Sequence, residues 1–309
     1  MTRKITVSLP DAVLREYLKP HADVTVVEWD FTGEPPQPQI DIVVPPYMGG
    51  TRVLRNLEAV ETTLVQSQSI GYDGVADSLP AGRVFANAAG VHETSTAELV
   101  LAMILASQRE FPRLMRNQQE GLWEARPTAS LADRRVLIVG YGGVGKAIEQ
   151  RLIPFETTVT RVASRQRTDG NGVIHGIAEL PELLPDHDIV VVGVPLGDAT
   201  RHLIDDKFLA AMPDGALLVN VARGPVADTE ALVRHTASGR IRAALDVTDP
   251  EPLPKDHPLW GTPGVIITPH VGGASSAMRP RMGRLLQRQI DLMLAGEPPV
   301  NVVLGGRPG

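Results

Sequence analysis

The stretch 135-RVLIVGYGGVGKAIEQRL-152 decides the fold of this chain. A strand-like run, RVLIV, enters a turn in which Gly140, Gly142 and Gly145 have the spacing G-x-G-x-x-G, and a helical pattern follows. Such a turn brings backbone N–H groups and the helix N-terminus close to a pyrophosphate. This context predicts a dinucleotide-binding unit, with a tight turn that binds nothing and the related glycine turns of methyltransferases as the alternatives.

On either side of this stretch, short β-branched runs alternate with helical patterns along almost the whole chain. Predicted strands form a first series at 5–9, 24–29, 40–44, 63–67 and 83–87, and a second at 135–140, 158–163, 188–194, 216–221, 243–247 and 265–269. Near-continuous apolar strands separated by helices are typical of parallel sheets covered on both faces. The predicted fold class is therefore α/β, with two doubly wound parallel-sheet domains of the Rossmann or flavodoxin-like type.

A long helical pattern at 94–119 separates the two strand series, and Thr and Ser residues at its start are suitable N-caps. Another helical pattern begins at Met278 and closes the chain. We expect residues 1–94 plus 278–309 to form one domain and residues 95–277 to form the other. The length of 309 residues agrees with two domains.

Composition narrows the class of protein. Apolar residues make up 43% of the chain and charged residues 21%, so substantial cores can form. The formal net charge of -6, without a Lys/Arg-dense run, argues against nucleic-acid or anionic-membrane partners. The absence of cysteine excludes disulfides and thiol catalysis. Since neither a signal peptide nor a membrane-spanning stretch is evident, we expect a cytoplasmic protein.

Three ionisable residues follow three successive predicted strands of the second series. Arg223 lies in VNVARGPVAD, Glu251 in ALDVTDPEPLP and His270 in ITPHVGG. Ligands of open α/β sheets bind at the carboxyl ends of the strands. Each residue alone has a structural explanation, as a surface charge, a loop acid or a packed histidine. Together, after a nucleotide-type turn, they form a candidate catalytic set.

The motifs VGYGGVG, PLGDATRHLI, VNVARGPVAD, ALDVTDPEPLP, HPLW and TPHVGG, in this order, resemble those of the D-isomer-specific 2-hydroxyacid dehydrogenases, closest in type to the glyoxylate/hydroxypyruvate reductases. SIGYDGV and ANAAGVHETSTAELVLAMILA also fit, so the resemblance covers nearly the whole chain. It implies a substrate-binding domain (1–94 plus 278–309) and a dinucleotide-binding domain (95–277), with an active-site cleft between them. It also implies a homodimer joined largely through the coenzyme domains, where 94–119 would lie.

The chemistry of 2-oxo acid reduction requires a hydride donor, a proton donor and a group that holds the carboxylate. Histidine suits proton donation because its pKa lies near neutrality. A carboxylate on its other ring nitrogen favours the imidazolium and fixes the ring. We therefore expect His270 to act as the acid, or as the base in reverse, with Glu251 as its partner. Arg223 offers a planar fork that can bind a carboxylate and polarise a carbonyl.

The resemblance implies further contacts. The expected cofactor-binding residues are Gly140, Gly142, Gly143, Val144, Gly145, Ser164, Arg165, Val194, Pro195, Val221, Ala222, Asp246, Gly272 and Gly273. The expected substrate-binding residues are Met48, Ile70, Gly71, Arg223 and His270. Among them, Asp246 would bind the carboxamide end of the nicotinamide. One departure is PLG in place of the family's usual PLT, so that Gly197 stands where a hydroxyl would contact the cofactor. No metal site is expected.

The segment 158-TVTRVASRQRTDG-170 bears on which dinucleotide binds. An NAD site is expected to show an acid here that reaches the adenine ribose, but Glu156 comes too early and Asp169 too late. Ser164 and Arg165 instead present a hydroxyl and a cation, and Arg167 adds a second cation. A 2′-phosphate would be held by such groups and repelled by an acid. We therefore expect NADPH to be preferred, with NAD possible; a solvated basic loop is the alternative.

The expected substrate is a small 2-oxo acid such as glyoxylate or hydroxypyruvate, interconverted with its D-2-hydroxy acid. The loop VVPPYMGG has no cation before Arg52, which argues against a phosphorylated substrate such as 3-phosphoglycerate. Formate dehydrogenases of this superfamily carry Gln where Glu251 stands, so Glu251 argues against formate. The alternatives are a 3-phosphoglycerate-type dehydrogenase or a phosphite dehydrogenase on the same fold, and a non-catalytic, dinucleotide-sensing corepressor-like protein.

Overall fold

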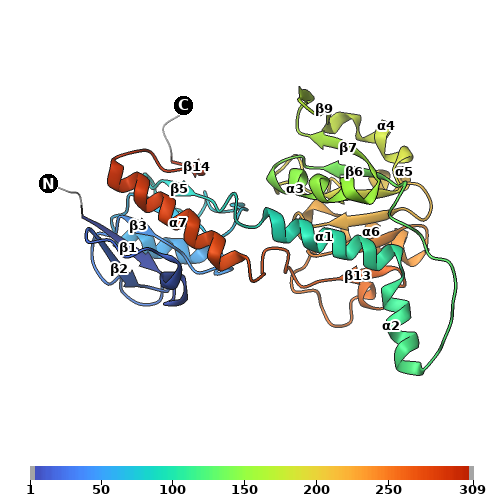
Figure 1. The fold of residues 1–309 in the computed structure, drawn as a ribbon, viewed down its shortest axis with the longest axis horizontal. Helices are drawn as coiled ribbons and strands as arrows, with labels where there is room; N and C mark the ends of the chain where they lie inside the picture. Colours follow the sequence, from blue (N-terminus) through green and yellow to red (C-terminus); the bar gives the residue numbers. More distant parts are fainter. Residues whose placement is uncertain (1–3, 306–309) are drawn as a thin grey trace. The chain divides into compact units, whose positions relative to one another are not determined.

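The computed structural model of the protein describes residues 4–305, which divide into two compact units. The first unit runs up to His92 and resumes at Ser275, and the second comprises Glu93–Ala274. These borders lie two and three residues before those expected from the sequence. Each unit is built on one mostly parallel sheet (Figure 1), so the predicted α/β fold class with two parallel-sheet domains is confirmed.

The sheet of the first unit has six strands in the order β14-β5-β4-β3-β1-β2. Its strands are β1 (Ile5–Leu9), β2 (Val24–Glu28), β3 (Ile42–Val43), β4 (Leu64–Gln66), β5 (Phe85–Ala86) and β14 (Val302–Leu304). All pairs are parallel except β14 with β5. Helix α7 (Met278–Ala295) packs Met282, Leu286 and Ile290 against one face of the sheet. The 3₁₀ helices η1 (Val13–Tyr17) and η2 (Thr51–Ala59) complete the unit.

The sheet of the second unit has eight strands in the order β13-β12-β11-β10-β6-β7-β9-β8. Its strands are β6 (Arg135–Val139), β7 (Thr158–Ala163), β8 (Arg167–Asp169), β9 (Gly172–Gly176), β10 (Ile189–Val192), β11 (Leu217–Asn220), β12 (Arg242–Leu245) and β13 (Val265–Ile267). Its α-helices are α1 (Glu93–Gln108), α2 (Phe111–Glu120), α3 (Gly143–Leu152), α4 (Leu180–Leu183), α5 (Asp206–Ala211) and α6 (Thr229–Ala237). All strand pairs are parallel except β8 with β9.

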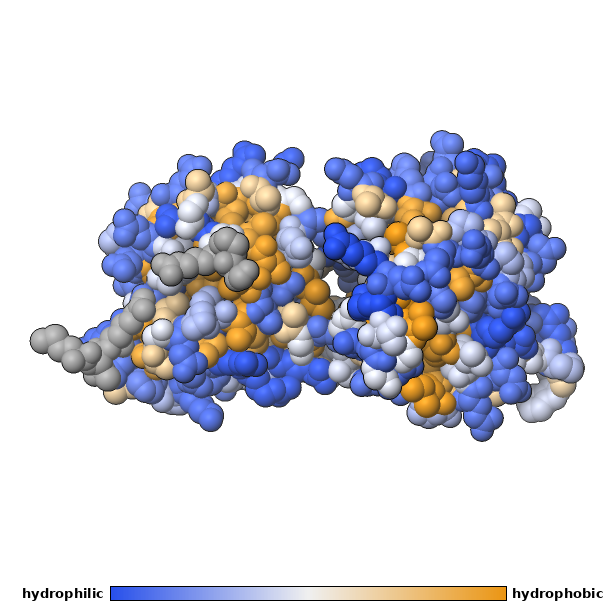
Figure 2. All heavy atoms as spheres, turned by 90° about the horizontal axis from the view of Figure 1, so that it is seen from above, coloured by the Kyte–Doolittle hydropathy of each residue, from blue (hydrophilic) through white to orange (hydrophobic). Residues whose placement is uncertain are grey.

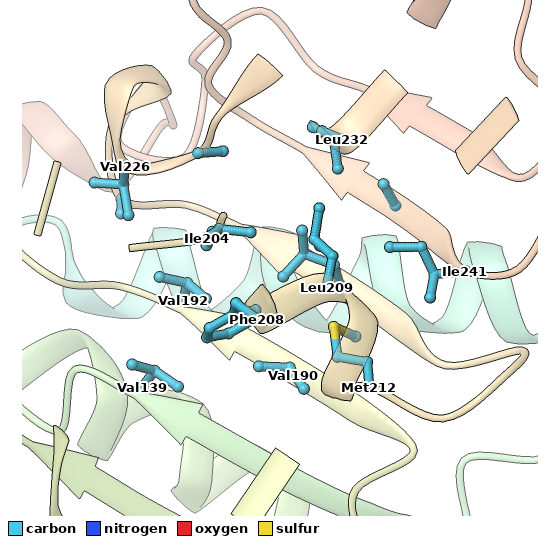
Figure 3. Packing of buried hydrophobic residues seen from close by; sticks show 14 of the residues in the cluster. Val139, Val190, Val192, Ile204, Phe208, Leu209, Met212, Val226, Leu232 and Ile241 are labelled. Atoms are coloured by element: carbon cyan, nitrogen blue, oxygen red, sulfur yellow. The ribbon is translucent and has the colours of Figure 1, made fainter. Parts of the chain in front are cut away.

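Both faces of this second sheet are buried. Successive residues of β6 alternate between two apolar clusters: Val136 and Ile138 face the α1–α3 side, whereas Leu137 and Val139 face the α5–α6 side. Figure 3 shows the second cluster, in which Phe208 and Leu209 of α5 pack on the sheet. Every residue of such a strand packs against apolar neighbours on one face or the other. This explains why the sequence of β6 is an almost continuous apolar run.

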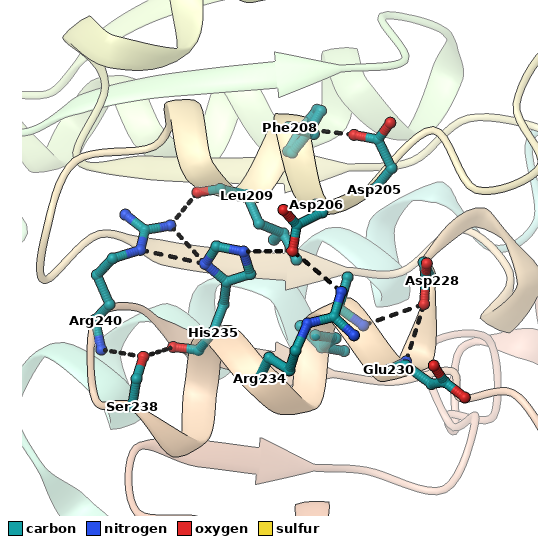
Figure 4. Close-up of polar contacts among 12 residues, drawn as sticks. Asp205, Asp206, Phe208, Leu209, Asp228, Glu230, Arg234, His235, Ser238 and Arg240 are labelled. Carbon is teal, nitrogen blue, oxygen red and sulfur yellow. Dashed lines mark hydrogen bonds and ion pairs between the residues drawn. The ribbon is translucent and has the colours of Figure 1, made fainter.

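Polar contacts fix the helices that cover the α5–α6 face (Figure 4). Asp205 caps α5 by accepting a hydrogen bond from Phe208 N at 2.8 Å, and Asp228 caps α6. Between the helices, His235 donates from Nε2 to Asp206 at 3.1 Å. Arg240 donates from Nη2 to the Nδ1 of the same ring at 3.0 Å. This chain of contacts joins the two helices over the sheet.

The structure differs from the sequence-based expectation in two places. The pattern at 94–119 forms two helices, because Glu110 adopts a left-handed conformation (φ 52°) between α1 and α2. The β8–β9 hairpin and β14 were not predicted. Strand β8 is short and polar, and β9 has only Val173 and Ile174 between glycines and a histidine, so the hairpin lacks the apolar alternation on which strand prediction depends.

The outer surface is mostly hydrophilic, with smaller apolar patches on each unit in the view of Figure 2. Among the helices of residues 4–305, none combines the length and the apolar character that crossing a bilayer requires.

Candidate active site

The glycine-rich turn brings two backbones into contact at the carboxyl edge of the second sheet. Gly140 has a φ of 106°, and a Cβ there would lie 2.6 Å from the carbonyl carbon and oxygen of Gly193, which follows β10. A Cβ at Gly145 would lie 2.6 Å from the carbonyl oxygen of Gly140. Backbone atoms can come this close at both positions only because glycine has no Cβ. They place the start of α3 directly over the gap between β6 and β10, where the strand order reverses.

The end of α3 at this turn has the features of a pyrophosphate site. The helix takes Gly142 as its N-cap, and Lys146 N donates to Gly142 O at 3.0 Å. The N–H groups of Gly143, Val144 and Gly145 therefore lie in the first turn, where the helix offers donors and a partial positive charge. A Cβ at Gly142 would meet no atom within 4 Å, so this backbone faces open space. The turn thus fits the phosphates of a dinucleotide.

The residues expected to contact the cofactor follow several parallel strands of one sheet. Ser164 and Arg165 follow β7, Val194 and Pro195 follow β10, Val221 and Ala222 follow β11, Asp246 follows β12, and Gly272 and Gly273 lie beyond β13. Because these strands run parallel, the residues share the carboxyl edge with the glycine-rich turn. Ser164 and Arg165 are exposed.

His270 and Glu251 meet at this edge. The ring donates from Nδ1 to Glu251 Oε1 at 2.6 Å, and the side chains are 26% and 39% exposed. This contact leaves Nε2 as the nitrogen that can exchange a proton with a ligand. His270 has a left-handed backbone (φ 52°), and its N–H donates to Asp246 O at 2.8 Å. A histidine oriented by a carboxylate is the arrangement that general acid–base catalysis requires.

Asp246 holds the loop that carries His270. Its side chain is buried, and Oδ1 accepts from Thr268 Oγ1 at 2.6 Å and from Val271 N at 2.9 Å. Its Oδ2 accepts from Gly272 N at 2.9 Å. These bonds account for three of the acceptor positions of the carboxylate. The structure thus gives Asp246 a positioning role that the sequence did not indicate, while the expected carboxamide contact stays a proposal.

Arg223 lies between β11 and the 3₁₀ helix η6 (Gly224–Val226). Buried Asn220 shapes this segment, because its Oδ1 accepts from Ala222 N at 3.0 Å and its Nδ2 donates to Arg223 O at 3.4 Å. A Cβ at Gly224 would lie 1.8 Å from Thr248 O, so the loops after β11 and β12 touch. Arg223, Glu251 and His270 therefore follow three neighbouring strands of the sheet.

The loops of the first unit that carry Met48, Ile70 and Gly71 follow β3 and β4 and are held by buried polar side chains. Asn87 Nδ2 donates to Ile70 O at 2.9 Å, and Gln68 Nε2 donates to Pro45 O at 2.9 Å. Met48 is 56% exposed with a left-handed backbone (φ 59°). Sequence reasoning missed Gln68 and Asn87; their signal is a polar residue at the end of an otherwise apolar strand.

Within residues 4–305, no three His, Asp or Glu side chains are grouped so as to hold a metal ion.

The chain is similar to known proteins over most of its length. The family model described as D-isomer specific 2-hydroxyacid dehydrogenase, NAD binding domain, matches residues 101–272. The chain is 34% identical to a glyoxylate reductase of Thermofilum pendens over 252 residues, covering 78% of this chain and 74% of that protein. It is 31% identical to the human glyoxylate reductase/hydroxypyruvate reductase over 295 residues, covering 90% of each. A D-isomer specific 2-hydroxyacid dehydrogenase from Xanthobacter autotrophicus Py2, solved with NADPH and MES, is 28% identical, with a TM-score of 0.81 and 98% coverage of both chains.

The substitution Asp246→Ala tests the positioning role of this carboxylate. It removes three buried hydrogen bonds, so we expect the free energy of unfolding to fall by about 3 kcal/mol, measured by chemical denaturation. The exposed residue Asp198 provides the control, because Asp198→Ala should change this free energy by less than about 0.5 kcal/mol. Equal effects of the two substitutions would contradict the role of Asp246.

Proposed function

Because the chain belongs to the D-isomer specific 2-hydroxyacid dehydrogenases, we propose that it reduces a small 2-oxo acid to its D-2-hydroxy acid with NADPH. The single observation that carries this proposal is the 2.6 Å hydrogen bond between His270 and Glu251, at the same sheet edge as the glycine-rich turn. The named relatives support a substrate such as glyoxylate or hydroxypyruvate.

Each residue at this edge of the sheet has a separate role in the reaction. The reduced nicotinamide, when bound, supplies the hydride. His270 donates the proton to the carbonyl oxygen from Nε2, and in the reverse direction it accepts the hydroxyl proton there. Glu251 holds the ring through its hydrogen bond with Nδ1. Val194 and Pro195 line the nicotinamide side, and Asp246 fixes the His270 loop.

Arg223 binds the substrate carboxylate and polarises its carbonyl. Its guanidinium is always charged and can donate two parallel hydrogen bonds, which matches the geometry of a 2-oxo acid. Met48, Ile70 and Gly71 supply further contacts to the substrate. The loop that carries Met48 has no cation before Arg52, so an unphosphorylated substrate is favoured over 3-phosphoglycerate.

A turnover assay tests this function. The purified chain should oxidise NADPH in the presence of glyoxylate or hydroxypyruvate, and His270→Ala should lower kcat/KM by about 10²–10⁴-fold because the proton donor is lost. His21→Ala, an exposed histidine of the first unit, is the control and should leave kcat/KM unchanged. Tight NADPH binding without turnover on a panel of 2-oxo acids would instead favour the sensor, and turnover of phosphite with NADP⁺ would favour phosphite oxidation.

The preference for NADPH rests on exposed Ser164 and Arg165 at the end of β7, where an NAD site would carry an acid. We expect kcat/KM for NADPH to exceed that for NADH by at least about tenfold. Ser164→Asp combined with Arg165→Glu should reverse the ratio, because the carboxylates repel a 2′-phosphate and accept from a ribose hydroxyl. Arg55→Glu, at an exposed arginine of the first unit, is the control for a charge reversal away from this segment and should leave the ratio unchanged. A wild-type preference for NADH would refute the assignment.

We also propose that the chain forms a homodimer through an apolar surface of α2 and the residues after it. Helix α2 has no buried residue, and the large apolar side chains of this surface are 38–98% exposed. They are Phe111, Leu114, Met115, Leu122 and Trp123. An exposed apolar patch of this kind marks a protein-binding surface.

The oligomeric state can be tested with Met115→Ser combined with Trp123→Ser. Light scattering should give twice the chain mass for the wild type and a single chain mass for this variant, because the apolar contact is removed. Trp260→Ser, at a half-exposed tryptophan outside this surface, should remain dimeric. A monomeric wild type would show that the surface has no such role.

A further inference from the structure

A closed ring of side-chain contacts lies beneath the glycine-rich turn and uses residues to which the reaction assigns no part. Tyr141, inside the turn, donates its hydroxyl to Glu149 Oε2 of α3. The second oxygen of Glu149 accepts from Arg161 Nε on β7. Tyr141 and Glu149 are 4% and 5% exposed, and the Arg161 side chain is 12% exposed. Burial and the hydrogen bond to Glu149 raise the pKa of Tyr141 to about 12, so the hydroxyl stays a donor.

Arg161 extends the ring to the β8–β9 hairpin. Its Nη1 donates to Asn171 O at 2.8 Å and lies 3.6 Å from Asp169 Oδ1, both at the hairpin turn. Its guanidinium carbon lies 5.3 Å from the centre of the Tyr141 ring. One side chain thus holds α3, the glycine-rich turn and the hairpin, which its fork of five N–H donors allows.

Arg167 closes the ring. It lies on β8, and its Nη2 donates to Tyr141 O at 3.2 Å, so the hairpin is bound to the turn from its other side. The segment between β7 and β8 carries Ser164 and Arg165. Residues 164–168 and 170–173 are exposed, so the hairpin has little apolar packing of its own. The hairpin is joined to the sheet by the pairing of β9 with β7 and by buried Ile174, whereas its outer part, residues 167–172, is held by the contacts of Arg161 and Arg167.

We propose that Arg161 is a positioning residue that orders the β8–β9 hairpin and thereby determines how tightly the 2′-phosphate of the dinucleotide is bound. The inference rests on the NADPH preference proposed above and adds Arg161, whose side chain is only 12% exposed and whose contacts are with Glu149 and the hairpin. Replacing Arg161 alone would leave the Glu149 carboxylate buried and unpaired, which strongly destabilises a fold. The test therefore neutralises both partners.

The variant Arg161→Met with Glu149→Gln keeps the volume of the pair and removes its charges. By calorimetry, we expect adenosine 2′,5′-bisphosphate to bind about tenfold more weakly than to the wild type, the size of one lost charge-assisted hydrogen bond. Binding of adenosine 5′-monophosphate should change by less than about twofold, because the phosphate site at α3 is retained. Amides of residues 167–174 should exchange hydrogen faster in the nucleotide-free variant.

The matched control is Arg135→Met with Asp186→Asn. This is also an ion pair of an arginine with a carboxylate in the second unit, with Arg135 Nη1 3.2 Å from Asp186 Oδ1. Unlike the Arg161 pair, it is exposed, and it lies at the amino end of β6. It should change neither nucleotide affinity nor hairpin exchange. Equal weakening of both nucleotides in the Arg161 variant, or no change in either, would overturn the proposal.

The two hypotheses fail in different ways. A wild-type chain that binds both nucleotides equally would refute the NADPH preference, and with it the effect of Arg161 on phosphate binding. The ordering of the hairpin would still be decided by hydrogen exchange: faster exchange in the variant supports it, and unchanged exchange overturns it.

Discussion

The contact between two backbones at Gly140 and Gly193 is the constraint on which the second unit depends. The chain can turn from β6 into α3 this close to β10 only because Gly140 has no side chain and tolerates a φ of 106°. Gly145 meets the same requirement where α3 passes over the turn. The donors of the first helical turn consequently face the point where the strand order reverses, and an anionic ligand is favoured there.

Buried polar side chains then fix the loops at the strand ends, whose conformation the sheet alone does not determine. Asp246 fixes the His270 loop, Asn220 shapes the Arg223 segment, and Asn87 holds Ile70 in the first unit. In each case a side chain at a strand end satisfies backbone groups of an irregular loop, which would otherwise be poorly ordered. The reactive side chains can stay partly exposed, because these buried polar side chains hold the loops in place instead of them.

The local patterns of the chain predicted most of the fold. Apolar runs at Arg135–Val139 and Leu217–Asn220 became central strands, and the helical pattern from Met278 became α7. The hairpin β8–β9 could not be predicted, because β8 is polar, the apolar run of β9 has only two residues, and β9 pairs with β7 through tertiary contacts. The break at Glu110 was also missed, since a left-handed residue in a continuous helical pattern gives no local signal.

The sequence by itself determined the α/β class, the nucleotide-type turn and the family, because periodicity, glycine spacing and ordered motifs are properties of neighbouring residues. Tertiary structure decided which side chains meet: His270 with Glu251, 19 positions away, Asp246 with the loop beyond it, and Arg161 with both Glu149 and the hairpin. These contacts depend on strands and helices arriving at one sheet edge. Sequence spacing places a residue on an element, but packing alone sets its distance from the next.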